Sequence, residues 1–408
     1  MAEWQTVRLG EIVKTNQSTY SPKENWQFVN YLDTGNITMN KIDEIQYINT
    51  AKDKLPSRAK RKVKTNSIIY STVRPNQLHY GIIKEQPDNF LVSTGFTVIE
   101  VNYDKAVPDF IYYALTKQEV TEQLQAIAEQ SVSAYPSLKP SDIENLEFML
   151  PDKKTQERIV AILRSIDEKI KENNAINNNL EQQAKAIFKS WFVDFEPFGG
   201  VQPSEMQFIP LQELCKVVTK GTTPTTLGKS FTSSGINFIK AESILDNHSI
   251  DSSKFAFIDE ETNALLKRSI IKVNDIVFTI AGTLGRFAMV DKSVLPANTN
   301  QAVAIIRPDE TKVTPAYLYS FFIGNWHNEY YSKRIQQAVQ ANLSLTTIKS
   351  LPIAVLNNTT MSNYDKLVSP LFALMKSNEE ENRRLSKLRD TLLPRLMSGE
   401  LDVSDKEI

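Results

Sequence analysis

The sequence is poor in the residues that build disulfide frameworks and zinc sites. It contains one cysteine, Cys215, and three histidines among 408 residues. A single cysteine cannot form an internal disulfide and suits a reducing compartment, so we expect a cytoplasmic protein. His79, His248 and His327 lie far apart in the chain, without the ligand spacing of a zinc site. We therefore expect no bound metal.

Long apolar runs and phosphate-binding loops are also missing. No run of about 18 apolar residues occurs, and the stretch MAEWQTVRLGEI lacks the basic and apolar regions of an export signal. The glycines of AGTLGR (281–286) do not have the spacing of a dinucleotide-binding or P-loop motif. We expect no membrane span and no cofactor bound by this chain.

What is present is an internal repeat at an interval of just over 200 residues. Trp4–Lys14 matches Met206–Lys216 at an offset of 202, and Ser137–Leu146 matches Asn342–Leu351 at an offset of 205. Each half begins with short β-branched and aromatic runs broken by turn residues, and continues into a long helical pattern. The sequence therefore predicts an α+β protein: a tandem repeat of two α/β domains, each followed by a long helix. The expected segments are domain 1 (1–152), a central helix (153–198), domain 2 (199–357) and a C-terminal helix (358–408).

Both long helices carry apolar residues in the 4,3 spacing of a heptad seam. The first seam runs from Ile159 to Trp191, and adding 205 gives a second seam from Tyr364 to Leu396. This pattern predicts that the two helices form an antiparallel coiled coil, with pseudo-two-fold symmetry between the halves. Asparagine occupies the same two steps of both seams. Such a polar layer fixes register at some cost in stability, and a frayed or bent helix is the alternative. The seam asparagines are Asn173, Asn177, Asn378 and Asn382.

The ends and irregular positions of these helices lead to further expectations. Thr155 is the expected N-cap of the first helix. In the second, Arg389 interrupts the seam, where Leu388 is the apolar replacement, and Pro394 should kink or end the helix. The aromatic segment Phe188–Phe198 is more apolar than a solvated linker, so it either packs against its own domain or receives a partner protein.

The net charge of −1 neither favours nor excludes nucleic acid, so local clusters have to decide. Lys52–Lys64 contains seven basic residues and one acidic residue among thirteen. Phosphates are the natural partner of such a cluster, and a solvated basic face is the alternative. The candidate phosphate-binding residues are Lys60, Arg61, Lys62 and Lys64.

Polar turns provide the candidates for base recognition, because Arg, Lys, Asn and Gln read base edges from loop tips or grooves. The turn 71–81 corresponds to the turn around Arg286, and 131–137 corresponds to 338–344. For any single residue, ordinary turn chemistry explains the pattern equally well. The candidates are Arg74, Asn76, Gln77, His79 and Tyr135 in the first half and Lys220, Thr222, Thr223, Arg286 and Asn342 in the second.

One acidic pattern is similar to a metal-dependent nuclease site. Asp152 and the sequence DEK at 167–169 provide carboxylates and a lysine. Helical rise separates them by about 22 Å, so we interpret them as solvated charges.

The repeat, LPDKKTQERIVAILRSIDEKI (150–170) and LRDTLLPRLMSGELDV (388–403) together resemble the specificity subunit of type I restriction-modification systems over essentially the whole chain. The resemblance implies a noncatalytic protein whose two target-recognition domains each read one half of an interrupted DNA sequence. Its paired helices would act as spacer and as docking surface for two modification subunits, N6-adenine methyltransferases that use S-adenosylmethionine. Separate restriction subunits would translocate and cut double-stranded DNA with ATP and Mg²⁺.

Two other classes compete with this interpretation. A coiled-coil adaptor that binds only proteins would not need the basic cluster or the polar loops. A self-sufficient nuclease or methyltransferase would need a cofactor loop or a carboxylate site, and neither pattern is present.

Overall fold

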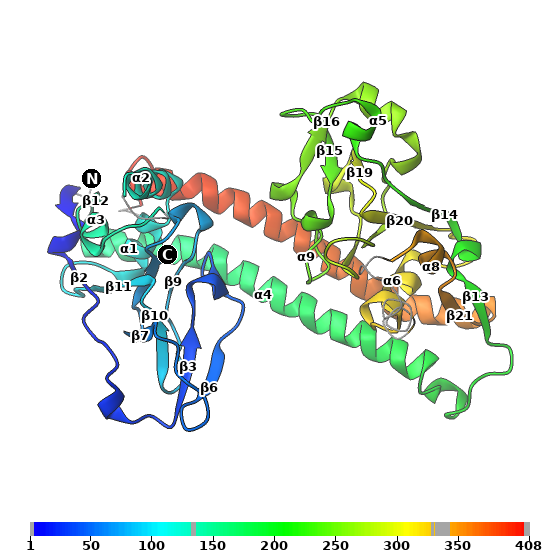
Figure 1. The fold of residues 1–408 in the computed structure, drawn as a ribbon, viewed down its shortest axis with the longest axis horizontal. Helices are drawn as coiled ribbons and strands as arrows, with labels where there is room; N and C mark the ends of the chain where they lie inside the picture. Colours follow the sequence, from blue (N-terminus) through cyan, green and yellow to red (C-terminus); the bar gives the residue numbers. More distant parts are fainter. Residues whose placement is uncertain (1–3, 132–135, 328–329, 331–342, 404–408) are drawn as a thin grey trace. The chain divides into compact units, whose positions relative to one another are not determined.

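A computed structural model of the chain describes residues 4–131, 136–327, 330 and 343–403. The chain forms two compact units, Met1–Lys171 with Asn382–Ile408 and Glu172–Glu381. Each unit therefore holds one α/β domain and part of both long helices (Figure 1).

Two four-stranded sheets form the first domain, because its short runs of β-branched and aromatic residues favour buried strands. Strand β1 (Gln5–Arg8) closes the domain by pairing antiparallel with β12 (Glu147–Leu150). The antiparallel sheet has the order β2 (Val13–Thr15), β11 (Phe96–Val101), β8 (Ile68–Ser71) and β9 (Tyr80–Ile82). The mixed sheet, in which β3 and β10 are parallel, has the order β6 (Gln46–Asn49), β3 (Phe28–Leu32), β10 (Phe90–Ser93) and β7 (Ala59–Lys62). A small hairpin and three helices complete the domain: β4 (Ile37–Thr38), β5 (Lys41–Ile42), α1 (Pro108–Leu115), α2 (Gln118–Glu129) and α3 (Pro140–Glu144).

The second domain repeats this plan. Strands β13 (Gln207–Pro210) and β21 (Pro352–Val355) form the equivalent closing pair. The antiparallel sheet has the order β14 (Cys215–Lys220), β20 (Val303–Pro308), β17 (Ile276–Thr279) and β18 (Phe287–Met289). The mixed sheet has the order β16 (Ala256–Ile258), β15 (Ile236–Ile239) and β19 (Ala297–Thr299). The helices in the described part of this domain include α5 (Glu260–Leu265), α6 (Pro315–Ile323) and α8 (Leu345–Lys349).

The repeat extends to single hydrogen bonds. The backbone N–H of Leu138 donates to Thr72 at 2.7 Å, and the N–H of Leu343, 205 residues later, donates to Ile280 at 2.9 Å. The predicted tandem of two α/β domains is therefore confirmed.

The long helices α4 (Lys153–Phe192) and α9 (Asn358–Met397) run antiparallel within each unit. In the first unit Asp167 of α4 pairs with Arg389 of α9, and in the second unit Asn177 pairs with Asn378. Every position of both predicted seams is buried or half-buried. The antiparallel coiled coil is thus confirmed. The pseudo-two-fold axis stays a prediction.

Each domain core is completed by the ends of both helices. In the first unit, Leu163 of α4 and Leu396 of α9 lie in one cluster with the sheet. In the second unit, Phe192 of α4 stacks edge-on against Tyr364 of α9, with ring centroids 5.0 Å apart. The aromatic segment that ends α4 therefore packs against the second domain. The expectation that it packs against the domain that its helix follows is wrong, because this end of α4 belongs to the second unit.

The helix ends differ from three expectations. Helix α4 begins at Lys153 because the carboxylate of Asp152, rather than Thr155, is the cap: it accepts the Thr155 N–H at 3.0 Å and its hydroxyl at 2.8 Å. Helix α9 continues through Pro394 to Met397, so this proline does not end the helix. Leu388 is 47% exposed and does not enter the seam. Arg389 remains there, because Asp167 neutralises it at 3.0 Å.

Candidate nucleic-acid interface

The candidate phosphate-binding residues of the basic cluster lie on and just after β7, and carboxylates offset part of their charge. Lys62 forms an ion pair with Glu24 and lies over the Trp26 ring, 5.1 Å from its centroid. Lys64 pairs with Glu100 at 3.1 Å. The half-buried Arg61 guanidinium has its pKa lowered by burial. Lys60 and Lys64 are the exposed members.

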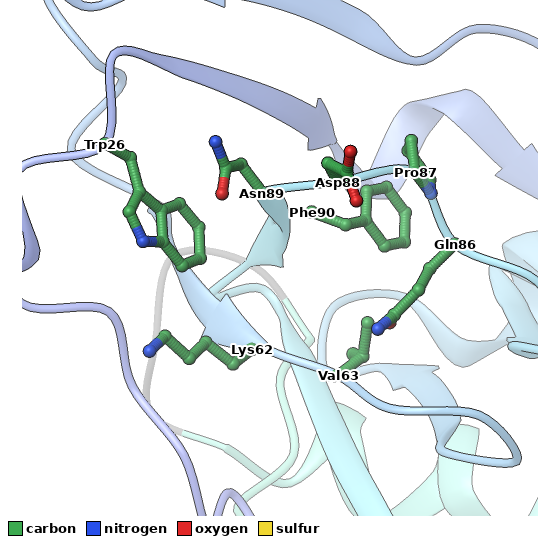
Figure 2. Close-up of a pocket in the computed structure, with 8 residues that line it drawn as sticks. All are labelled: Trp26, Lys62, Val63, Gln86, Pro87, Asp88, Asn89 and Phe90. Atoms are coloured by element: carbon green, nitrogen blue, oxygen red, sulfur yellow. The ribbon is translucent and has the colours of Figure 1, made fainter.

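An open pocket of about 260 Å³ adjoins this cluster (Figure 2). Trp26 and Lys62 line one side, and the turn Gln86–Asn89 leading into β10 lines the other. Sequence patterns gave no signal for this hollow, because strands β3, β7 and β10 come from distant parts of the chain. Its lining residues are Trp26, Lys62, Val63, Gln86, Pro87, Asp88, Asn89 and Phe90.

The turn between β8 and β9 projects the exposed side chains of Arg74, Asn76 and Gln77. Arg74 has a left-handed backbone (φ 48°), and its N–H donates to Pro136 at 3.1 Å. The N–H of Asn76 donates to the side-chain oxygen of Gln125 on α2 at 3.1 Å. The structure thus brings these predicted residues together on one turn, which these hydrogen bonds hold in place.

His79, at the end of the same turn, is oriented by its neighbours. Its Nδ1 lies 2.6 Å from the carbonyl oxygen of Ile37 and 3.4 Å from the Thr38 hydroxyl. Because a carbonyl only accepts, Nδ1 carries the proton, and Nε2 is an acceptor in the neutral ring. The sequence identified His79 but not this contact.

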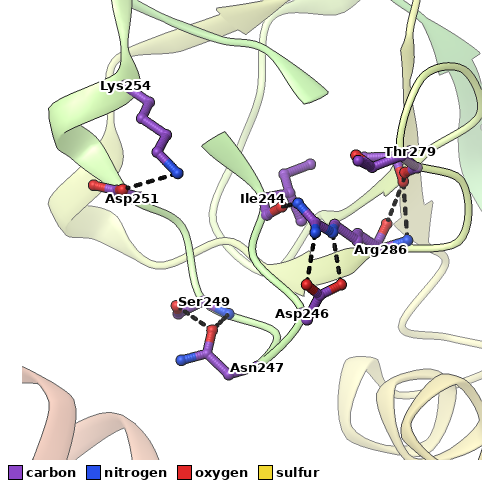
Figure 3. Close-up of polar contacts among 9 residues, drawn as sticks. Ile244, Asp246, Asn247, Ser249, Asp251, Lys254, Thr279 and Arg286 are labelled. Carbon is purple, nitrogen blue, oxygen red and sulfur yellow. Dashed lines mark hydrogen bonds and ion pairs between the residues drawn. The ribbon is translucent and has the colours of Figure 1, made fainter. Parts of the chain in front are cut away.

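Arg286 occupies the equivalent position in the second domain. His79 precedes Tyr80, which pairs with Tyr70, and Arg286 precedes Phe287, which pairs with Phe278. Its guanidinium contacts both carboxylate oxygens of Asp246, with Nε to Oδ1 at 2.7 Å and Nη2 to Oδ2 at 2.6 Å (Figure 3). Asp246 was not predicted, because it lies on a different loop.

The remaining candidates of the second domain lie where β14 ends. Lys220 is exposed. The hydroxyl of Thr222 accepts from Arg268 at 3.4 Å, and the Thr223 hydroxyl donates to the side-chain oxygen of Gln301. Sequence reasoning missed Arg268 and Gln301, which come from other segments. The predicted Tyr135 and Asn342 lie outside the described residues.

The seam asparagines form a polar layer in the second unit. The side-chain amide of Asn378 donates to Asn177 at 2.8 Å, and the Asn177 amide donates to the carbonyl of Met375 at 3.1 Å. Asn173, which is 1% exposed, donates to the carboxylate of Glu381 at 2.7 Å. The frayed-helix alternative is wrong, because α4 is continuous through this stretch. The predicted pair of Asn173 with Asn382 stays a prediction.

The carboxylates of the nuclease-like pattern make structural contacts. Asp152 caps α4, and Asp167 accepts from the Tyr113 hydroxyl at 2.6 Å as well as from Arg389. Among the residues that the structure describes, no group of three or more His, Cys, Asp or Glu side chains is arranged to hold a metal ion. No helix in the described ranges is both long and apolar enough to cross a membrane.

Known proteins are similar to this chain in sequence and in architecture. The family described as "Type I restriction modification DNA specificity domain" matches residues 1–182 and 203–356. The chain is 28% identical to the type I restriction enzyme HindI specificity subunit of Haemophilus influenzae, over 98% of this chain and 100% of that protein. It is 26% identical to the MjaIX specificity subunit of Methanocaldococcus jannaschii, over 80% of this chain and 76% of that one.

A solved structure shows the same fold. The type I restriction-modification S subunit from M. genitalium superimposes with a TM-score of 0.57 at 16% identity, over 99% of this chain and 97% of that one. Because the family matches both halves of the repeat, the chain belongs to the type I restriction-modification specificity subunits, which recognise DNA sequence.

Proposed function

We propose that this chain is the noncatalytic DNA-reading subunit of a type I complex, and that each recognition domain reads one half of an interrupted target. The supporting observation is the equivalence of His79 and Arg286: one position in the repeated frame carries different hydrogen-bonding groups in the two halves. Two domains with the same backbone fold but different hydrogen-bonding side chains at this position are suited to recognising two different short DNA sequences. Lys60 and Lys220 would contact phosphates, which set register without reading sequence.

The partners of this proposal are double-stranded DNA, two modification subunits and restriction subunits. S-adenosylmethionine would be bound by the modification subunits, and ATP and Mg²⁺ by the restriction subunits. Exposed apolar side chains on the coiled coil support protein docking: Leu367 and Leu374, one heptad apart on α9, are each 47% exposed. The native mass of the purified complex tests the stoichiometry of two.

A domain exchange tests the reading function. Residues 1–150 are replaced by the equivalent domain of a relative, and methylated bases are sequenced in a host that expresses the complex. We expect one half of the methylated motif to change and the other half to remain. Exchange of residues 199–357 is the matched control and should change only the other half. A change in both halves, or in neither, contradicts the two-reader proposal.

A further inference from the structure

We propose that Arg286, held by Asp246, reads a guanine in the half-site of the second domain. This inference rests on the proposed function and names the base and the positioning residue for one of its contacts.

The hydrogen-bonding geometry of the pair leaves the recognition edge of the guanidinium directed away from Asp246. Asp246 contacts the side edge formed by Nε and Nη2 (Figure 3). Nη1 makes a longer and weaker contact, 3.4 Å, with the carbonyl oxygen of Ile244. The end edge, with one N–H from each of Nη1 and Nη2, is the edge that matches O6 and N7 of guanine. An arginine held in this way presents two donors in a fixed orientation.

The exposure of the pair is typical of a recognition contact more than of a structural one. The side chain of Asp246 is 81% exposed and that of Arg286 is 25% exposed. An exposed ion pair contributes little to folding, so its main effect is to restrict the rotamers of the arginine. Arg307 and Asp275 provide the contrast in the same domain. They form the same two-point contact at 2.7 Å and 2.7 Å, but Asp275 is 0% exposed.

Hydrogen bonds and ring stacking also hold the two loops that carry Arg286 and Asp246. The N–H of Arg286 donates to the hydroxyl of buried Thr279 at 2.9 Å. The ring of His248, two residues after Asp246, stacks on Phe287 with centroids 4.1 Å apart. Gly285 has φ +83°, a conformation that favours glycine and aims the following arginine. The arginine is therefore preorganised before any ligand arrives.

Comparison with the first domain indicates that this position accepts different base-contacting side chains. His79 and Arg286 both reach a backbone carbonyl, that of Ile37 and that of Ile244. Each of these isoleucines is fully buried and follows a 3-10 turn, Thr34–Asn36 or Ala241–Ser243. The backbone carbonyl that each side chain contacts is the same in the two halves, whereas the side chain itself differs. This is expected of a position that recognises different bases.

The test uses the full chain in complex with its modification subunits. Methylated bases are sequenced in hosts that express the wild type, R286A, R286K or D246N. For R286A and R286K we expect one guanine position of the second half-site to become degenerate, with discrimination falling by about 5- to 150-fold. D246N should relax the same position by less. The matched control is R307K, which should lower thermal stability and leave the motif unchanged.

A second measurement covers the case in which R286A abolishes methylation. Binding of wild-type and R286A complexes is compared on target duplexes with 7-deazaguanine, which lacks N7, at each guanine in turn. One substitution should weaken wild-type binding and have no further effect on R286A. The inference is overturned if no guanine behaves in this way, if the second half-site contains no G·C pair, or if the R286A motif is unchanged. Absence of any two-part motif for the wild type would instead contradict the proposed function.

Discussion

The side-chain amide of Asn378 on α9 donates a hydrogen bond to the side-chain oxygen of Asn177 on α4 at 2.8 Å. The two residues are 201 positions apart, and seam spacing alone predicts that they meet. Each is a polar residue in a seam that is mostly apolar. The contact therefore sets which turn of one helix faces which turn of the other, because a slip by one heptad would leave both amides against apolar side chains.

Asn177→Leu should destabilise the paired helices by about 1–3 kcal/mol, because it leaves the Asn378 amide without its acceptor. Urea unfolding of the full chain measures this. The double variant N177L/N378L should recover most of the loss, since both polar groups are then replaced. Asn178→Leu, an exposed neighbour, is the control and should change little. If the single variant keeps both its unfolding midpoint and its motif spacing, the polar layer does not set register.

Phe188→Ala should destabilise the second domain by about 3–5 kcal/mol, although Phe188 belongs to the helix that follows the first domain. The side chain is 2% exposed and its ring lies 5.9 Å from that of Tyr317 on α6. Hydrogen exchange should therefore lose protection in α6 and keep it in α1. Gln183→Ala, at an exposed position of the same helix, is the control. Loss of protection in α1 alone would contradict this packing.

The periodic features of the fold were predictable because they depend on spacing within one segment. Ile159 to Trp191 repeat every three or four residues, so their burial follows from helical geometry. Alignment of the two halves then predicted the second domain and the second seam. Phe188 shows the limit of such reasoning: its apolar character was clear, but its partner depends on which domain the end of α4 reaches.

The site was less predictable, because its electrostatics depend on contacts between distant segments. Lys62 and Lys64 belong to an evident basic cluster, yet Glu24 and Glu100, which come from other segments of the chain, offset their charge. Arg286 was found from its turn, but Asp246 lies 40 residues away on another loop. No local pattern identifies which carboxylate a cation meets, and that contact decides which edge of the arginine remains for a ligand.

Lowering the pH below about 6.5 should destabilise the second domain through His327. Burial among aromatic rings lowers the pKa of this imidazole from 6.5 to about 3. Between these values the unfolded chain binds more protons than the folded one, so stability is full above pH 6.5 and falls by up to about 1.4 kcal/mol per pH unit below it. Urea unfolding at pH 8, 6 and 5 measures the slope. His327→Gln should flatten the slope. An identical slope for H327Q would show that other groups cause the effect.

Leu374→Glu should weaken docking of a modification subunit without unfolding the chain. Leu374 is 47% exposed, so a charge there costs little in the free protein. If a partner buries this side chain, loss of about 1.5–3 kcal/mol of apolar contact lowers affinity by roughly 10- to 150-fold. Ala373→Glu, an exposed neighbour turned by one helical step, adds the same charge on a different face and is the matched control. Titration of the purified chain with modification subunits, followed by native mass measurement, separates the two variants. Equal binding by both would show that this face of α9 is not part of the interface, and equal loss would show that charge on α9, rather than the apolar contact, controls docking.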